Sequence, residues 1–158
     1  MSERPESSLN GVVEGFYGRP WTARQRRCLF DWLRAAGLTA YLYAPKDDPK
    51  HRARWREPYG PTEAAELRAL ADECRQRGLQ FVYAIAPGLD LVAARPEETA
   101  TLIAKLRQAR GLGALHSAVL WDDIPTALSA ADRRAFGTHA AAQCAVTNRV
   151  FDALKRHE

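Results

Sequence analysis

Short apolar runs alternate with helical patterns along most of this chain, and the alternation constrains its fold more than any other feature. The apolar runs begin at residues 11, 40, 81 and 117 of the 158 residues. A run and the helical pattern after it together take roughly 35 to 40 residues, a length typical of a βα unit. Strands that are apolar on both faces and lead into helices favour a parallel sheet. The sequence therefore predicts an α/β fold of four consecutive βα units.

Residues that start or stop helices divide the chain in the same way. Thr22 with Gln25 forms a capping box that starts the first helix, and Gly37 ends it. Thr62 is expected to cap the second helix, and Pro96 to be the first residue of the third. Ser129 is expected to cap one last helix that continues to Leu154. The expected strands cover residues 11–17, 40–44, 81–85 and 117–121.

Two architectures agree with this pattern. Eight such units would make a TIM (β/α)8 barrel, so four make half a barrel, and a small doubly wound sheet competes with that reading. No glycine-rich phosphate loop or dinucleotide fingerprint follows a predicted strand, which argues against nucleotide binding. Residues 1–10 are polar and are expected to form a disordered tail, and residues 11–158 to form one domain.

Composition excludes several classes of protein. The net charge of +4 is carried mostly by arginines scattered over the predicted helices, and no nucleic-acid motif accompanies it, so no nucleic-acid partner is expected. No apolar run approaches a membrane span, and the N-terminus lacks a signal peptide's apolar core, which predicts a cytoplasmic protein without membrane contact. Cys28, Cys74 and Cys144 are far apart in the sequence and are expected to be buried free thiols.

Polar and aromatic residues follow every predicted strand. In parallel α/β folds, ligands bind beyond the carboxyl ends of the strands. The candidates there are Gly15 and Tyr17 after the first strand, Lys46, Asp47, Asp48, Lys50 and His51 after the second, Asp90 after the third, and Asp122 and Asp123 after the fourth. The sequence thus predicts one site built from all four loops.

The neighbouring carboxylates Asp122 and Asp123 are the sharpest local signal. Their repulsion should raise at least one pKa, which suits a group that donates a proton. Such a pair also occurs as a turn, a helix cap or a magnesium site, and the residues alone leave these alternatives open. Taken singly, Lys46 is a surface lysine, Tyr17 a packing residue and His51 a solvated loop residue.

Four segments taken together resemble glycoside hydrolase family 84, the O-GlcNAcases, which are β-N-acetylglucosaminidases. The segments are residues 11–21 (GVVEGFYGRPW), 41–57 (YLYAPKDDPKHRARWRE), 81–90 (FVYAIAPGLD) and 120–124 (LWDDI). Their order and spacing agree with the family's catalytic barrel from about residue 11 to the C-terminus. The resemblance favours the half-barrel over the doubly wound sheet.

The resemblance implies a retaining hydrolysis of N-acetyl-β-glucosaminides through an oxazoline, in which the substrate's acetamido oxygen is the nucleophile. It implies that Asp122 orients and polarises the acetamido group, while Asp123 acts as general acid and then as base. Lys46 and the Gly15 backbone would bind sugar hydroxyls, and Tyr17 would shape the pocket. The partner would be an N-acetylglucosaminide or an O-GlcNAc-modified peptide, with no metal or organic cofactor.

The family's later strands carry further sugar-binding residues that have no counterpart in these 158 residues. A four-stranded parallel sheet also has two open edges. We therefore expect a homodimer in which two half-barrels close into one barrel, with activity that is weak or altered. The alternatives are a catalytically inactive half-barrel that binds N-acetylglucosamine or a glycopeptide, and a self-assembling structural fragment.

Overall fold

A computed structural model of the chain describes residues 9–122 and 124–155, and within them the predicted parallel sheet is present. Its strands, in chain order and in sheet order, are β1 (Gly11–Glu14), β2 (Ala40–Tyr43), β3 (Gln80–Ile85) and β4 (His116–Val119). All three neighbouring pairs are parallel. Most of the expected N-terminal tail, residues 1–8, and the catalytic candidate Asp123 lie outside the described residues.

The helices occupy the intervals that the sequence predicts. They are α1 (Ala23–Ala35), α2 (Pro61–Gln76), a 3-10 turn η1 (Pro87–Leu89), α3 (Pro96–Gly111), α4 (Ala130–Phe136) and α5 (His139–Lys155). The Thr22–Gln25 capping box, Pro96 at the start of α3 and the Ser129 cap of α4 are confirmed.

Two predictions about helix ends are wrong. The cap of α2 is Gly60 rather than Thr62, because Pro61 already lies in the first turn. The single helix expected from Ser129 to Leu154 is two helices, α4 and α5, separated at Gly137. Gly137 adopts φ +74°, a left-handed conformation that ends a helix.

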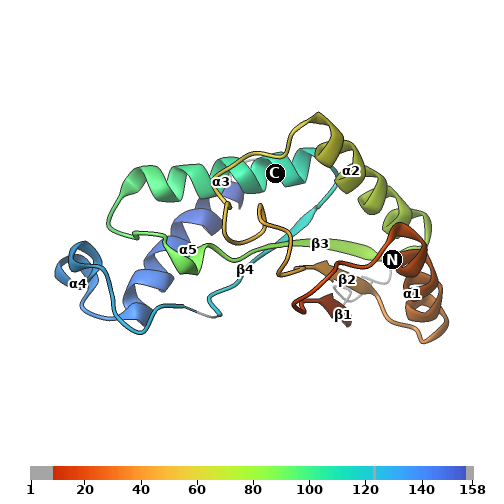
Figure 1. Ribbon diagram of the computed structural model, residues 1–158, viewed down its shortest axis with the longest axis horizontal. Helices are drawn as coiled ribbons and strands as arrows, with labels where there is room; N and C mark the ends of the chain where they lie inside the picture. Colours follow the sequence, from red (N-terminus) through yellow and green to blue (C-terminus); the bar gives the residue numbers. More distant parts are fainter. Residues whose placement is uncertain (1–8, 123, 156–158) are drawn as a thin grey trace, which may run out of the picture.

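One face of the sheet carries the core. Alternate residues of β2 and β3, including Tyr41, Phe81, Tyr83 and Ile85, are at most 4% exposed and belong to one cluster with side chains of the helices. Figure 1 shows α1, α2 and α3 along this side of the sheet. The rings of Tyr43 and Tyr83 stack at 6.3 Å between centroids. The core therefore lies between sheet and helices, as in an α/β layer.

The opposite face of the sheet is only partly covered by the described residues. Val13 of β1 points to this side and is 55% exposed. The alternating side-chain directions of a strand place Leu42, Val82 and His116 on the same side. This apolar face is what distinguishes the sheet from one that is covered on both sides.

Some surface assignments differ from the sequence prediction. Trp32 of α1 is 72% exposed, whereas Phe30 and Leu33 are the residues of that helix that are buried in the core. Cys74 is buried as expected, and burial raises the pKa of its thiol to about 12. Cys28 and Cys144 are exposed, so their expected burial is wrong.

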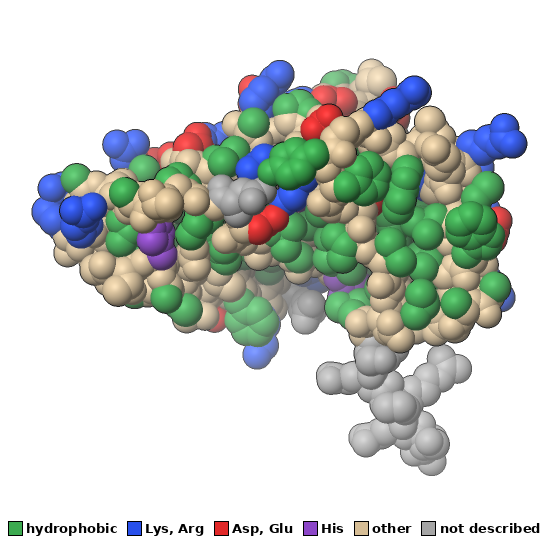
Figure 2. Space-filling view, turned by 60° about the horizontal axis from the view of Figure 1, so that its bottom comes forward, with side chains coloured by type: hydrophobic (Ala, Val, Ile, Leu, Met, Phe, Trp, Pro, Cys, Tyr) green, Lys and Arg blue, Asp and Glu red, His purple; other side chains and the backbone are tan. Residues whose placement is uncertain are grey.

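The molecular surface carries its basic residues in several places. Figure 2 shows Lys and Arg side chains at separate positions around one face, with hydrophobic side chains between them. None of the helices in the described part of the chain is both long and apolar enough to cross a membrane.

Candidate functional site

The first two strand ends are joined at the carboxyl edge of the sheet. The backbone N–H of Ala44 donates to the carbonyl of Glu14 at 3.1 Å, and that of Lys46 donates to Phe16 at 3.2 Å. These bonds continue the β1–β2 pairing beyond the strands. They place Gly15 and Tyr17, which flank Phe16, next to the start of the loop that carries Lys46.

Lys46 and Asp122 form an ion pair across this edge. The Lys46 ammonium donates a hydrogen bond to the Asp122 carboxylate, which joins the loop after β2 to the end of β4. The lysine side chain is 6% exposed and the aspartate side chain 47% exposed. Two candidates that are 76 positions apart in the sequence therefore meet, with the carboxylate facing solvent.

The environment of Asp122 keeps its carboxyl group ionised. Partial burial opposes the charged form, but the hydrogen bond and the charge of Lys46 outweigh burial and lower the pKa of Asp122 below its ordinary value of 3.8. The charge of Arg52 acts in the same direction. Asp122 is thus a hydrogen-bond acceptor rather than a proton donor near neutral pH.

Tyr17 and Arg52 form the outer part of the same edge. The guanidinium carbon of Arg52 lies 5.5 Å from the centroid of the Tyr17 ring, a distance suited to a cation–π contact. Tyr17 is 62% exposed. Arg52 was not predicted as a member of the site from the sequence. Its only signal there is its position directly after His51, within the family-like segment 41–57.

Asp48 and Asp90 fix the loops rather than face the open edge. Asp48 accepts hydrogen bonds from the hydroxyls of Tyr43 and Tyr59, at 2.9 and 2.8 Å. Asp90 accepts from the Trp55 indole at 2.9 Å and forms an ion pair with Arg56 at 2.6 Å. Both carboxylates therefore hold the long loop between β2 and α2 in place. Asp47 remains exposed on that loop.

His51 is fully buried, which contradicts its reading as a solvated loop residue. Its Nδ1 lies 2.7 Å from the carbonyl oxygen of Ala84 in β3. Burial lowers the pKa of the imidazole below its ordinary value of 6.5. This burial could not be predicted from the sequence, because a histidine in a polar loop has no neighbouring periodicity to indicate which way its side chain points.

Glu14 is a second buried polar residue that the sequence reading missed. It has no exposed surface, and its carboxylate accepts two hydrogen bonds from Arg26, at 2.8 Å each, and one from the hydroxyl of Tyr41. It also accepts from the backbone N–H of Trp21 at 2.9 Å. Glu14 thus ties β1, β2 and the start of α1 together beneath the loop that carries Gly15 and Tyr17.

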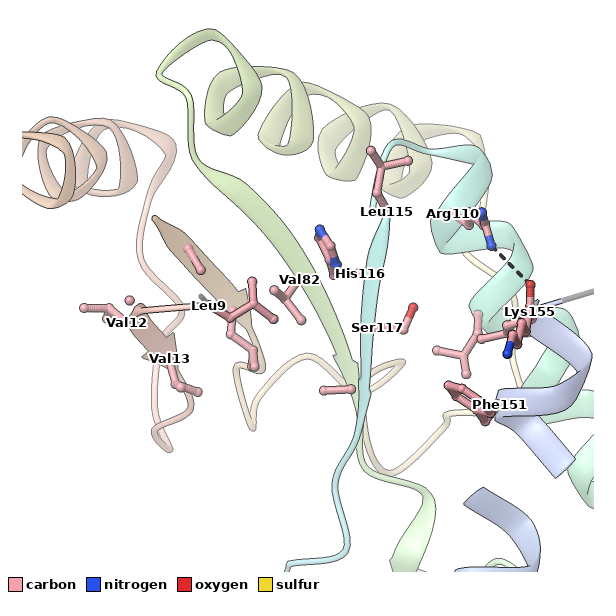
Figure 3. Close-up of a pocket in the computed structure, with 16 residues that line it drawn as sticks. Leu9, Val12, Val13, Val82, Arg110, Leu115, His116, Ser117, Phe151 and Lys155 are labelled. Carbon is pink, nitrogen blue, oxygen red and sulfur yellow. Dashed lines mark hydrogen bonds between the residues drawn. The ribbon is translucent and has the colours of Figure 1, made fainter. Parts of the chain in front are cut away.

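A large hollow in the described part of the chain lies apart from the Lys46–Asp122 pair. It has a volume of about 600 Å³ and extends from the open face of the sheet around β4 to α5. Figure 3 shows Val13, Val82 and His116 on its strand side and Phe151 with Lys155 on its α5 side. Neither Lys46 nor Asp122 lines it.

Among residues 9–122 and 124–155, no group of three or more His, Cys, Asp or Glu side chains is arranged to hold a metal ion.

Comparison with known proteins gives consistent matches. Residues 10–158 match the sequence model of a family described as beta-N-acetylglucosaminidase. The chain is 47% identical over 150 residues to the protein named Protein O-GlcNAcase in Rattus norvegicus, and equally to that in Mus musculus. Each alignment covers 95% of this chain but only 16% of the relative.

A solved structure of an O-GlcNAc hydrolase mutant from Thermobaculum terrenum superimposes on this chain with a TM-score of 0.90 and 35% sequence identity. The match covers 95% of this chain and 33% of that one. The chain therefore spans about a sixth of its mammalian relatives and a third of this solved structure.

Proposed function

The chain belongs to the β-N-acetylglucosaminidase family. We propose that the residues at the carboxyl edge of its sheet catalyse the hydrolysis of β-linked N-acetylglucosamine with retention of configuration. The observation that carries this proposal is the Lys46–Asp122 pair at the end of β4, directly before Asp123. The substrate class is O-GlcNAc on a peptide, in line with the names of the relatives, or a small N-acetylglucosaminide.

The two aspartates divide the chemistry. Asp122 is held ionised by Lys46, so it accepts a hydrogen bond from the acetamido N–H of the substrate and makes the acetamido oxygen more nucleophilic. That oxygen attacks the anomeric carbon, the glycosidic bond breaks, and an oxazoline forms as the acetamido N–H proton passes to Asp122, which returns it when water opens the ring. Asp123 donates its proton to the leaving oxygen, then removes one from the water that opens the oxazoline. No metal or organic cofactor takes part.

The neighbouring groups bind the sugar. The Lys46 ammonium has three donors, and only some of them are needed for Asp122, so it can also donate to a sugar hydroxyl. The Gly15 backbone lies on the adjoining loop and is proposed as a second hydroxyl contact. Tyr17 is exposed beside them and forms a wall of the pocket.

The decisive test is hydrolysis of a chromogenic aryl N-acetyl-β-glucosaminide by the purified chain. We expect turnover that Asp123→Asn abolishes and that Asp72→Asn, a distant surface change on α2, leaves intact. NMR of the first-formed sugar should show the β-anomer, because two successive inversions retain configuration. Equal rates for the unchanged chain and Asp123→Asn, or an α-anomer as first product, would refute the proposal.

We also propose that residues 11–158 form half of a (β/α)8 barrel that a second copy completes in a homodimer. Two features support this: β1 and β4 each pair with one neighbour in the described sheet, and the open face is apolar around Val13 and Leu42. Pairing would cover both. One chain has a mass of 17.6 kDa, and light scattering should give twice that mass. A monomer at micromolar concentration would contradict the dimer. A cytoplasmic location remains part of this proposal.

A further inference from the structure

His51 is a buried titratable residue that the proposed hydrolysis does not use. Its Nδ1 is 2.7 Å from the carbonyl oxygen of Ala84. A carbonyl oxygen only accepts hydrogen bonds, so a bond here requires the proton on Nδ1 and leaves Nε2 as a bare acceptor. Nε2 is buried without a hydrogen-bond partner among the described residues. The arrangement fits a neutral imidazole in one defined tautomer.

The bonds of His51 reproduce those of a strand residue. In a parallel sheet, one residue donates its N–H to the neighbouring strand and accepts from that strand two residues further on. His51 accepts from the N–H of Ala86 at 2.9 Å, and its ring donates to Ala84. Its own backbone N–H is engaged with Asp48, at 3.1 Å. The imidazole Nδ1–H therefore replaces a backbone donor.

This replacement occurs where β3 extends beyond the end of β2. The pairing of β2 with β3 ends at Tyr43 and Tyr83, whereas β3 continues to Ile85. His51 occupies the place that a longer β2 would fill. The segment from Lys46 to His51 is therefore held at both of its ends. Lys46 is bonded to Phe16 after β1, and His51 is bonded to Ala84 and Ala86 at the end of β3.

We propose that His51 is a positioning residue for the Lys46–Asp122 pair: its neutral, Nδ1-protonated ring fixes the loop after β2 to β3 and thereby sets where Lys46 meets Asp122. The inference rests on the proposed function for its catalytic consequence. Its structural part, the tautomer and the hold on Lys46, requires no turnover and can be tested separately.

Three charged groups among the described residues act on the ring. They are Asp48 and Lys46 of its own loop and Asp122 at the end of β4. The two carboxylates favour a protonated ring, while burial and Lys46 disfavour it, and burial is the largest influence. Protonation would also place a donor on Nε2, which has no described partner, so the ring remains neutral around neutral pH.

The first experiment reads the tautomer by long-range ¹H–¹⁵N NMR of the chain labelled in its four histidines, with His51→Asn as the assignment control. We expect an Nδ1–H signal for His51 and a pKa below the ordinary value of 6.5, because burial disfavours the charged ring. An Nε2–H tautomer, or a pKa at or above 6.5, would overturn the proposal.

The second experiment compares two amide replacements. Asn places its N–H at the position of Nδ1, whereas Gln places it at the position of Nε2, so His51→Asn keeps the donor to Ala84 and His51→Gln displaces it. The readout is the Asp122 carboxyl pKa, followed by ¹³C NMR and assigned with Asp122→Asn. It should remain lowered in His51→Asn and return toward 3.8 in His51→Gln.

The third readout is hydrolysis of the aryl glycoside. His51→Gln should lose on the order of 100-fold in kcat, the cost of displacing a catalytic group by about 1 Å, while His51→Asn stays within about tenfold of the unchanged chain. An Asp122 pKa or a kcat that is the same in both variants would overturn the positioning role. Absence of turnover in the unchanged chain would count against the proposed function alone, since the two NMR measurements still decide the role of His51.

Discussion

Two carboxylate–cation pairs in this protein differ in how far they are open to solvent. Glu14 and Arg26 meet behind β1 with side-chain exposures of 0% and 15%, while Lys46 and Asp122 meet at the carboxyl edge with 6% and 47%. Every acceptor position of Glu14 is directed at the protein, but the Asp122 carboxylate retains a solvent-facing side. A pair satisfied entirely by the protein holds the fold, and a pair left partly open can bind a ligand.

The largest expected effect comes from breaking the buried pair. Glu14→Ala leaves the Arg26 guanidinium, the Tyr41 hydroxyl and the Trp21 N–H without their acceptor, so the free energy of unfolding should fall by about 4 kcal/mol. Urea denaturation followed by circular dichroism measures this loss. A change below about 1 kcal/mol would show that the Glu14 pair is no more structural than a surface ion pair.

Breaking the open pair should affect rate far more than stability. Asp122→Asn removes the ionised acceptor, and we expect kcat to fall on the order of 100-fold or more, about 2.7 kcal/mol in activation free energy. Its unfolding free energy should change by less than about 1 kcal/mol, because the carboxylate is half exposed. The same denaturation and hydrolysis assays apply, and a large stability loss with an unchanged rate would reverse the comparison.

A substitution that keeps the charge of Arg26 tests how much the geometry of the buried pair contributes to stability. Arg26 donates to Glu14 from two nitrogens, Nε and Nη2, and lysine cannot reproduce this two-point contact. Arg26→Lys should therefore cost about 2 kcal/mol of unfolding free energy even though the charge is kept. The matched control is Arg54→Lys, an exposed pair with Glu57, which should cost much less.

The smallest expected effect is a pH dependence of stability from Asp122. Its pKa is lowered in the folded chain, so the unfolded chain binds the proton more tightly and protonation favours unfolding. The contribution of Asp122 should be fully present above its unfolded pKa and disappear as the pH falls through the folded pKa, with a size under about 1 kcal/mol. Unfolding curves of the unchanged chain and Asp122→Asn should differ near neutral pH and converge in acid.

Much of the fold could be read from local patterns. The capping box at Thr22, Pro96 at the start of α3 and the apolar runs of the strands each report on residues close in sequence, and the structure confirms them. The errors have a shared cause. Cys28 and Cys144 are exposed although they were expected to be buried, because which side of a helix faces the sheet depends on how the helix is docked.

The functional site likewise has some features that could be predicted from the sequence and others that could not. The order of polar residues after the strands predicted that Lys46 and Asp122 share one edge, since parallel strands bring their carboxyl ends together. Nothing in the local sequence indicated that Asp90 would be occupied by contacts with Trp55 and Arg56, or that Glu14 would be buried with Arg26. These partners come from distant segments and exist only after folding.

The sequence by itself determined the four βα units, their parallel order and the membership in a family of β-N-acetylglucosaminidases, because these depend on residue types at short, regular spacings. The tertiary structure alone decided which carboxylates are free to meet a ligand and that His51 substitutes for a strand residue beside β3. The physical reason is that burial and hydrogen-bond pairing belong to positions in space, and residues far apart in the chain supply them together.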